Sequence, residues 1–244
     1  MSLSPEHIAQ ISHALDDPRL PDWSAPPIVP GDWEACEGEL AYQIVTAASA
    51  ALSTAGGTPL GIAYAVDRVR MMPFPVYPRG RLIELQGHAG PDRPGLICLL
   101  LTENRFIKFD GSSRPIHALN EELPPDLSTP ELREAYLQLF MNWVRGELGR
   151  FQPVETVEDI EALCLPDETL PELDHLLEPV TEVSPPDDEA KSEHTLTLVY
   201  GTDLFQATMK LSATGNVDML EDQILHESLP LRLETLVGPM VTLA

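Results

Sequence analysis

Residues that could carry out acid–base or nucleophilic chemistry gather in two turn-rich segments of the first half of the chain. His88 opens the first segment, HAGPDRP, while Asp110 and Ser112 lie in the second, DGSSRP, which His117 follows closely. If the strands between these segments pair as a meander, both turns emerge at the same end of one sheet. A histidine, a carboxylate and a hydroxyl could then approach one another, as acid–base or nucleophilic catalysis requires.

The same two segments also have a simpler interpretation. Asp-Gly-Ser-Ser and Gly-Pro-Asp-Arg-Pro are rich in residues that form solvent-exposed turns. The sequence contains no glycine-rich phosphate loop, no HExxH, no calcium-binding loop and no GxSxG. The seven histidines lack metal-ligand spacing, so we expect no metal site and no cofactor. His88, Asp110, Ser112 and His117 therefore stay candidates, and no catalytic residue is assigned.

The cysteines and the apolar runs bear on the compartment. Cys36, Cys98 and Cys164 lie far apart without a CxxC pair, which argues against disulfides and structural zinc and favours a reducing, cytoplasmic setting. Cys98 lies in an apolar run, so we expect it to be buried and unreactive. We find no signal-peptide pattern, and the longest apolar run, 96–101, is too short to span a bilayer, so no membrane association is expected.

The charge is strongly acidic and unevenly distributed. The chain of 244 residues has a formal net charge of −24, which disfavours direct nucleic-acid binding and anionic membranes and favours a basic partner. The segment 155–193 holds fourteen acidic residues and a single basic one, whereas 66–114 holds eight basic residues against five acidic ones. We therefore ask whether the acidic segment covers the basic one and competes there with an external partner.

The basic segment 66–114, called the arginine-rich stretch below, has three interpretations. It pairs with the acidic segment of the same molecule, it binds an anionic ligand or nucleic acid, or it is a solvated face. Its candidate binding residues are Arg68, Arg70, Arg79, Arg81, Arg93 and Arg114.

The clearest structural pattern predicts a helix over 130–148. Thr129 is a favourable N-cap, and Pro130 occupies the first turn, where its missing N–H costs nothing. Apolar and aromatic residues recur at steps of three and four, which predicts one buried face. A core helix is the simpler interpretation. Tyr136 and Trp143 are also candidate partner-binding residues, because tyrosine and tryptophan are frequent interface anchors.

The fold class predicted is α+β, with antiparallel β meanders packed against two long helices at about 33–54 and 130–148. The first β region comprises strands at 81–86, 96–102 and 105–109, followed by an extended segment at 115–119. The second comprises strands at 195–200, 203–211 and 217–225, followed by a closing helix at 229–237. A further short helix is expected at 4–16. Because 99–109 resembles 198–208, an alternative interpretation is that the chain contains two similar α+β halves.

Composition predicts three regions along the chain. We expect a main α+β domain over 1–165, an acidic, proline-rich linker over 166–193, and a C-terminal β region over 194–244 packed on the main domain.

Three classes of function are compatible with these features. The favoured one is a non-enzymatic interaction protein, such as an adaptor, chaperone, immunity or antitoxin-like partner of a more basic protein. The second is a hydrolase or transferase whose site lies near His88, Asp110 and His117. The third is a nucleic-acid mimic that presents carboxylates where phosphates would lie. The sequence does not determine the oligomeric state or the identity of the partner.

Overall fold

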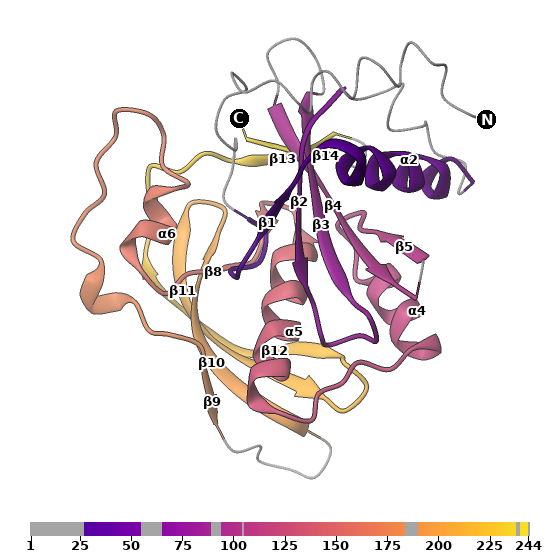
Figure 1. Ribbon diagram of the computed structural model, residues 1–244. Coiled ribbons are helices and arrows are strands. Elements are labelled where there is room, and N and C mark those ends of the chain that lie inside the picture. Colours follow the sequence, from indigo (N-terminus) through magenta and orange to yellow (C-terminus); the bar gives the residue numbers. More distant parts are fainter. Residues whose placement is uncertain are drawn as a thin grey trace. The chain divides into compact units, whose positions relative to one another are not determined.

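The computed structural model describes residues 27–54, 65–88, 94–103, 105–183, 190–237 and 240–243 (Figure 1). The chain folds into two compact units, each of which combines an antiparallel sheet with helices, so the predicted α+β class is confirmed. Unit 1 comprises 1–110 and 235–243, and unit 2 comprises 111–234. Unit 2 is therefore inserted in the sequence of unit 1. The expected helix at 4–16 lies outside the described residues.

Unit 1 is built on a seven-stranded sheet with the order β1-β2-β3-β4-β14-β13, in which β5 also pairs with β4. The predicted meander is present, because β3, β4 and β5 follow one another as antiparallel neighbours. The strands are β1 (Glu34–Cys36), β2 (Ala65–Pro73), β3 (Arg81–His88), β4 (Pro94–Thr102), β5 (Arg105–Lys108), β13 (Glu234–Val237) and β14 (Met240–Leu243).

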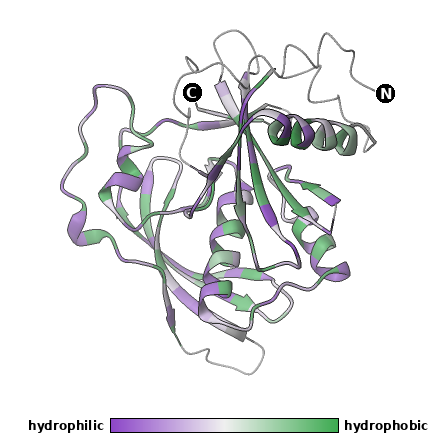
Figure 2. Cartoon of the chain, viewed as in Figure 1, coloured by the Kyte–Doolittle hydropathy of each residue, from purple (hydrophilic) through white to green (hydrophobic). Residues whose placement is uncertain are grey.

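The helix α2 (Gly38–Thr54) packs against one face of this sheet. Its small residues Ala41 and Ala48 are fully buried, which permits the close approach that an alanine-rich helix favours. Figure 2 shows hydrophobic and hydrophilic residues interspersed along α2. The helix begins at Gly38 and not near residue 33, because β1 (Glu34–Cys36) pairs with β2 instead.

Unit 2 contains a five-stranded sheet with the order β12-β11-β10-β8, in which β9 also pairs with β10. The predicted strands at 195–200 and 203–211 leave a two-residue turn between them. That turn, Gly201-Thr202, joins β10 to β11, and Gly201 has the positive φ of 65° that it requires. The strands are β8 (Gln152–Pro153), β9 (Thr181–Val183), β10 (Ala190–Tyr200), β11 (Asp203–Ser212) and β12 (Val217–His226).

The helix α5 (Pro130–Trp143) covers one face of the unit 2 sheet, where Leu137 and Met141 pack against Leu196 and Leu198. It ends at Trp143 and not near residue 148, because the following residues form a two-stranded hairpin, β6 (Arg145–Gly146) with β7 (Gly149–Arg150). A second apolar cluster includes Leu163, Leu173 and Val199 together with Ile160 of the short helix α6 (Val157–Glu161). The short 3-10 helix η1 (Asp174–Leu176) follows in sequence.

Two sequence predictions for unit 2 are wrong. Residues 115–119, expected to be extended, belong to the helix α4 (Arg114–Glu122), which tolerates Pro115 because the proline lies in its first turn. Residues 229–237, expected to be helical, are extended. Part of this segment bonds to a distant part of the chain: the Leu165 amide donates to the carbonyl of Pro230, and the Arg232 amide donates to that of Leu163. Its last residues, Glu234–Val237, form β13.

Candidate functional site

The histidine proposed for catalysis in unit 1 is engaged by a neighbouring strand. His88 lies at the end of β3, and its Nδ1 is 2.7 Å from Oδ2 of Asp67 on β2. Asp67 lies where the register shifts between Val66 and Arg68. Burial raises the pKa of the Asp67 carboxyl, while the nearby imidazole of His88 lowers it. The pair therefore joins two adjacent strands of one sheet.

The other catalytic candidates lie around the start of α4. Asp110 and Ser112 are exposed, and His117 lies in α4 with its ring centroid 5.9 Å from that of Phe140. Each of the two histidines thus contacts a residue outside the predicted set. Within the described part of the chain, no three His, Cys, Asp or Glu side chains are grouped as metal ligands would be.

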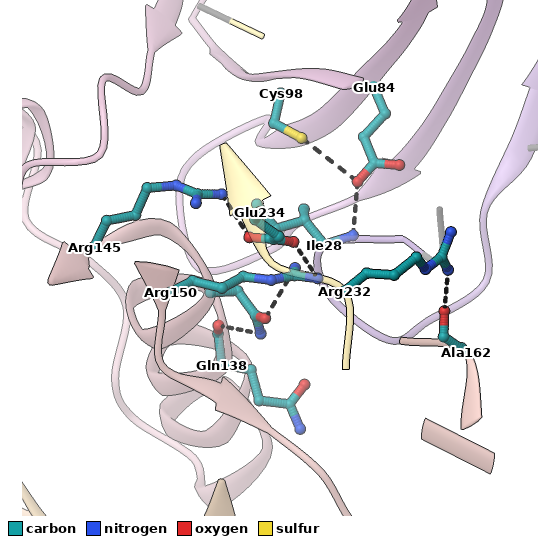
Figure 3. A network of polar contacts seen from close by, with 10 residues as sticks. Ile28, Glu84, Cys98, Gln138, Arg145, Arg150, Ala162, Arg232 and Glu234 are labelled. Atoms are coloured by element: carbon teal, nitrogen blue, oxygen red, sulfur yellow. Dashed lines mark hydrogen bonds and ion pairs between the residues drawn. The ribbon is translucent and has the colours of Figure 1, made fainter. Parts of the chain in front are cut away.

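The arginine-rich stretch is divided between buried and exposed positions. Arg70 forms an ion pair with Glu84 and lies 5.3 Å from the centre of the Trp33 ring. Glu84 is 0% exposed and also accepts hydrogen bonds from the Ile28 amide at 2.7 Å and the Cys98 thiol at 3.6 Å (Figure 3). Among the other predicted binding residues, Arg93 lies outside the described residues, Arg68 is half-buried, and the exposed ones are Arg79, Arg81 and Arg114.

The two aromatic candidates of α5 are buried. The Tyr136 hydroxyl donates to the carbonyl of Gly215 at 2.6 Å and accepts from Nδ2 of Asn120 at 2.8 Å. Trp143, the last residue of the helix, is buried as well. These contacts connect α5 to α4 and to the turn that precedes β12.

A second polar cluster, which is partly buried, lies where α5 meets β9 and β10. Arg133 donates to both carboxylate oxygens of Glu182, at 2.8 and 2.6 Å, and this contact lowers the pKa of Glu182. Glu182 is paired in register with His194, whose Nε2 lies 2.8 Å from the Ser192 hydroxyl. Burial lowers the pKa of His194. Because both Ser192 and His194 are buried, this pair is closed to substrate in this conformation.

An exposed sheet edge in unit 2 is a feature that the sequence did not reveal. β12 is the terminal strand in the described sheet and pairs there with β11. Three of its apolar side chains are widely exposed: Met219 at 40%, Leu220 at 47% and Ile224 at 47%. Edge strands present unpaired backbone groups and so offer a template for another strand. Hydrophobic and hydrophilic residues are interspersed along β12 (Figure 2).

The register with β11 shows which apolar side chains of β12 adjoin the core of unit 2. The register places Met219 opposite Met209 and Ile224 opposite Phe205, so these side chains extend the apolar face that α5 covers. The strand carries three acidic residues and no lysine or arginine; the acidic residues are Asp218, Glu221 and Asp222, all exposed. The edge is therefore apolar and acidic together.

No described helix is long and apolar enough to cross a membrane; the longest of them, α2, has 17 residues.

Comparisons do not assign this chain to a family. No family model, no curated protein and no solved structure matches the chain. The case for a function consequently depends on the geometry and charge of the two units.

Proposed function

We propose that this is a non-enzymatic interaction protein that captures a basic, extended segment of another protein along β12. The observation that carries the proposal is the terminal position of β12 combined with its exposed apolar and acidic side chains. A segment added to a sheet edge gains backbone hydrogen bonds, while alternate side chains supply specificity.

The apolar face of β12 supplies the hydrophobic part of the interaction. Met219 and Ile224 already border the cluster of Leu196, Leu198 and Met209. A partner strand beside β12 would place its own apolar side chains against Met219 and Ile224. Since each side chain is close to half exposed, covering it contributes on the order of 1 kcal/mol.

The acidic residues of β12 determine which strand can pair. A second copy of this chain would bring Asp218, Glu221 and Asp222 beside the same residues of its partner, and such like-charge contacts are costly. A strand with lysine or arginine at alternate positions meets the opposite charge. The net charge of −24 also accelerates the approach of a basic protein at low salt.

A synthetic strand tests this proposal directly. The probe is a peptide of alternating lysine and valine, matched to the 10 residues of β12, and the control peptide alternates glutamate and valine. We expect the lysine peptide alone to bind and to slow hydrogen exchange at the β12 amides. The variant D218K/E221K/D222K should bind at least about tenfold more weakly, since it replaces attraction by repulsion.

A matched variant separates strand pairing from general charge attraction. E161K/E168K/E172K changes the total charge equally at exposed positions of the α6–η1 region, so its affinity should stay close to that of the unmodified protein. Equal losses in both triple variants, or exchange protection away from β12, would show that the peptide binds the acidic surface without using this edge. M219S/I224S should weaken binding without altering its salt dependence.

A further inference from the structure

Met219 of β12 is the most exposed methionine in the part of the chain that the structure describes. It is 40% exposed. Three other methionines are almost fully covered, at 4% exposure or less: Met141, Met209 and Met240. Two more, Met71 and Met72 of β2, are half-buried. The fold therefore leaves the thioether of Met219 open to a reagent in solvent and restricts access to the other described thioethers.

Met219 and Met209 form a matched pair across two strands. The register places Met219 of β12 directly opposite Met209 of β11. Met209 is buried in the apolar cluster with Leu196 and Leu198, whereas Met219 extends that cluster toward solvent. The two thioethers share their chemistry and differ in access, so any difference in their reactivity measures the effect of the fold.

A β-bulge adjoins Met219. Thr208 of β11 is opposite Glu221, and the next residue, Met209, is opposite Met219, so Leu220 is an extra residue without a partner on β11. A bulge disrupts the ladder locally and bends the strand. Both Met219 and Leu220 are exposed at this point, which leaves Met219 accessible from solvent.

We infer that Met219 is an oxidation site through which a peroxide regulates strand capture by β12. The inference rests on the proposed function for its effect. In the reaction, the sulfur attacks one peroxide oxygen, the O–O bond breaks and a sulfur–oxygen bond forms. The sulfur loses two electrons, and the second oxygen leaves as water with both peroxide protons. The product is methionine sulfoxide, a polar and chiral side chain.

Oxidation of Met219 weakens capture because this side chain supplies part of the apolar contact. In the free protein the sulfoxide oxygen stays in water, since Met219 is widely exposed, so unit 2 keeps its fold. A captured strand would cover that oxygen without offering it a donor, which is costly. We expect the oxidised protein to bind a strand about fivefold more weakly or worse.

The exposure of Met219 also permits reversal. Methionine sulfoxide reductases act on one sulfoxide epimer each. The sulfoxide gains two electrons from a dithiol, which becomes a disulfide, and the oxygen leaves as water. Oxidation at this position is therefore a reversible signal and not only damage.

Peptide mapping by mass spectrometry after graded hydrogen peroxide treatment tests the site. In the folded protein, Met219 should gain one oxygen at least about fivefold faster than Met209, since susceptibility follows exposure. In concentrated urea the two rates should become similar, because the fold no longer shields Met209. Equal rates in the folded protein would overturn the assignment of Met219 as the oxidation site.

The lysine–valine peptide, which contains no sulfur, tests the regulation. After peroxide is removed, the oxidised protein should bind this peptide about fivefold more weakly, with circular dichroism confirming that it is folded. Both sulfoxide reductases with dithiothreitol should restore the affinity, whereas dithiothreitol alone, which reduces oxidised cysteines, should not. M219L keeps an apolar side chain without a thioether, so peroxide should leave its affinity unchanged. M71L/M72L alters the half-buried methionines of unit 1 and should stay sensitive.

Failure of this inference and failure of strand capture give different results. If the untreated protein does not bind the lysine–valine peptide, strand capture is wrong and its regulation is wrong with it. If the untreated protein binds and the oxidised protein binds equally well, strand capture stands and Met219 does not regulate it. The same conclusion follows if peroxide weakens binding by M219L as much as binding by the unmodified protein.

Discussion

Glu84 shows how a charged residue is accommodated inside unit 1. Its carboxylate lies on the central region of the sheet, yet it is surrounded by donors from Arg70, the Ile28 amide and Cys98. Trp33 covers the guanidinium of Arg70. A buried pair of this kind contributes little net stability as a pair, but loss of one partner leaves an uncompensated charge.

Replacing one member of this pair should therefore be severe. We expect R70M to lower the free energy of unfolding by about 3–5 kcal/mol, because Glu84 would stay buried without its cation. Urea denaturation followed by tryptophan fluorescence measures this. The double variant R70M/E84L should recover most of the loss, and a single variant that costs less than about 1 kcal/mol would contradict the assigned role.

His194 should make the stability of unit 2 depend on pH. Burial holds the pKa of His194 below its usual value, so over part of the pH range the unfolded chain binds a proton that the folded chain does not. Of the charged groups nearby, Glu182 raises this pKa and Arg133 lowers it. The contribution of His194 to the free energy of unfolding is fully present above pH about 6.5. It decreases as the pH falls below that value, by at most about 1.4 kcal/mol per pH unit.

Urea midpoints at pH 8 and pH 5.5 measure this effect. H194Q cannot titrate, so its midpoint should fall less between these two pH values than that of the unmodified protein. H175Q alters an exposed histidine of η1 and should keep the full decrease. A decrease of equal size in H194Q and the unmodified protein would mean that other groups cause the pH dependence.

At the scale of elements, the start of α5 is a local feature that the sequence specified. The Thr129 side chain accepts from the Leu132 amide at 3.4 Å, as its N-cap position predicts. T129A should destabilise unit 2 by about 1 kcal/mol, whereas T129S should retain most of the stability. Thermal denaturation of both variants measures the difference, and equal midpoints would show that the cap contributes nothing.

Elements whose form depends on distant residues were predicted less well. The apolar pattern of α5 and the glycine turn between β10 and β11 are local, so both were found. The segment Glu34–Cys36 became a strand because β2 pairs with it, and 229–237 became extended because 163–165 bonds to its first part and β14 pairs with its last. Such choices depend on pairing partners that a local pattern does not contain.

The candidate sites also combine features that a local pattern predicts with features that depend on residues distant in the sequence. The strand at 217–225 was predicted from its composition, but its place at the edge follows from sheet order, which is set by long-range pairing. Arg150 and Arg232 line one small pocket although 82 residues separate them in the chain, and no spacing rule connects them. The catalytic candidates were chosen from residue type and from the expected meander, which do not determine side-chain contacts. His88 contacts Asp67, and the His117 ring lies beside that of Phe140.

For the whole molecule, the acidic charge should make stability rise with salt. A net charge of −24 destabilises the compact state through self-repulsion. We expect the thermal midpoint to rise with NaCl and to level off toward 1 M, where the Debye length is about 3 Å. The variant E161K/E168K/E172K, which carries less charge, should respond less steeply; a midpoint that falls with salt would indicate that ion pairs dominate instead.

The discontinuous sequence of unit 1 has a consequence for synthesis on the ribosome. Leu96 of β4 pairs with Val241 of β14, so that stretch of the first sheet waits for 145 further residues to be translated. At about 5–20 residues per second, the delay is roughly 7–30 s. Throughout that interval the inserted unit can already fold, while the nascent chain holds part of β4 without its final neighbour and is at its most vulnerable to aggregation.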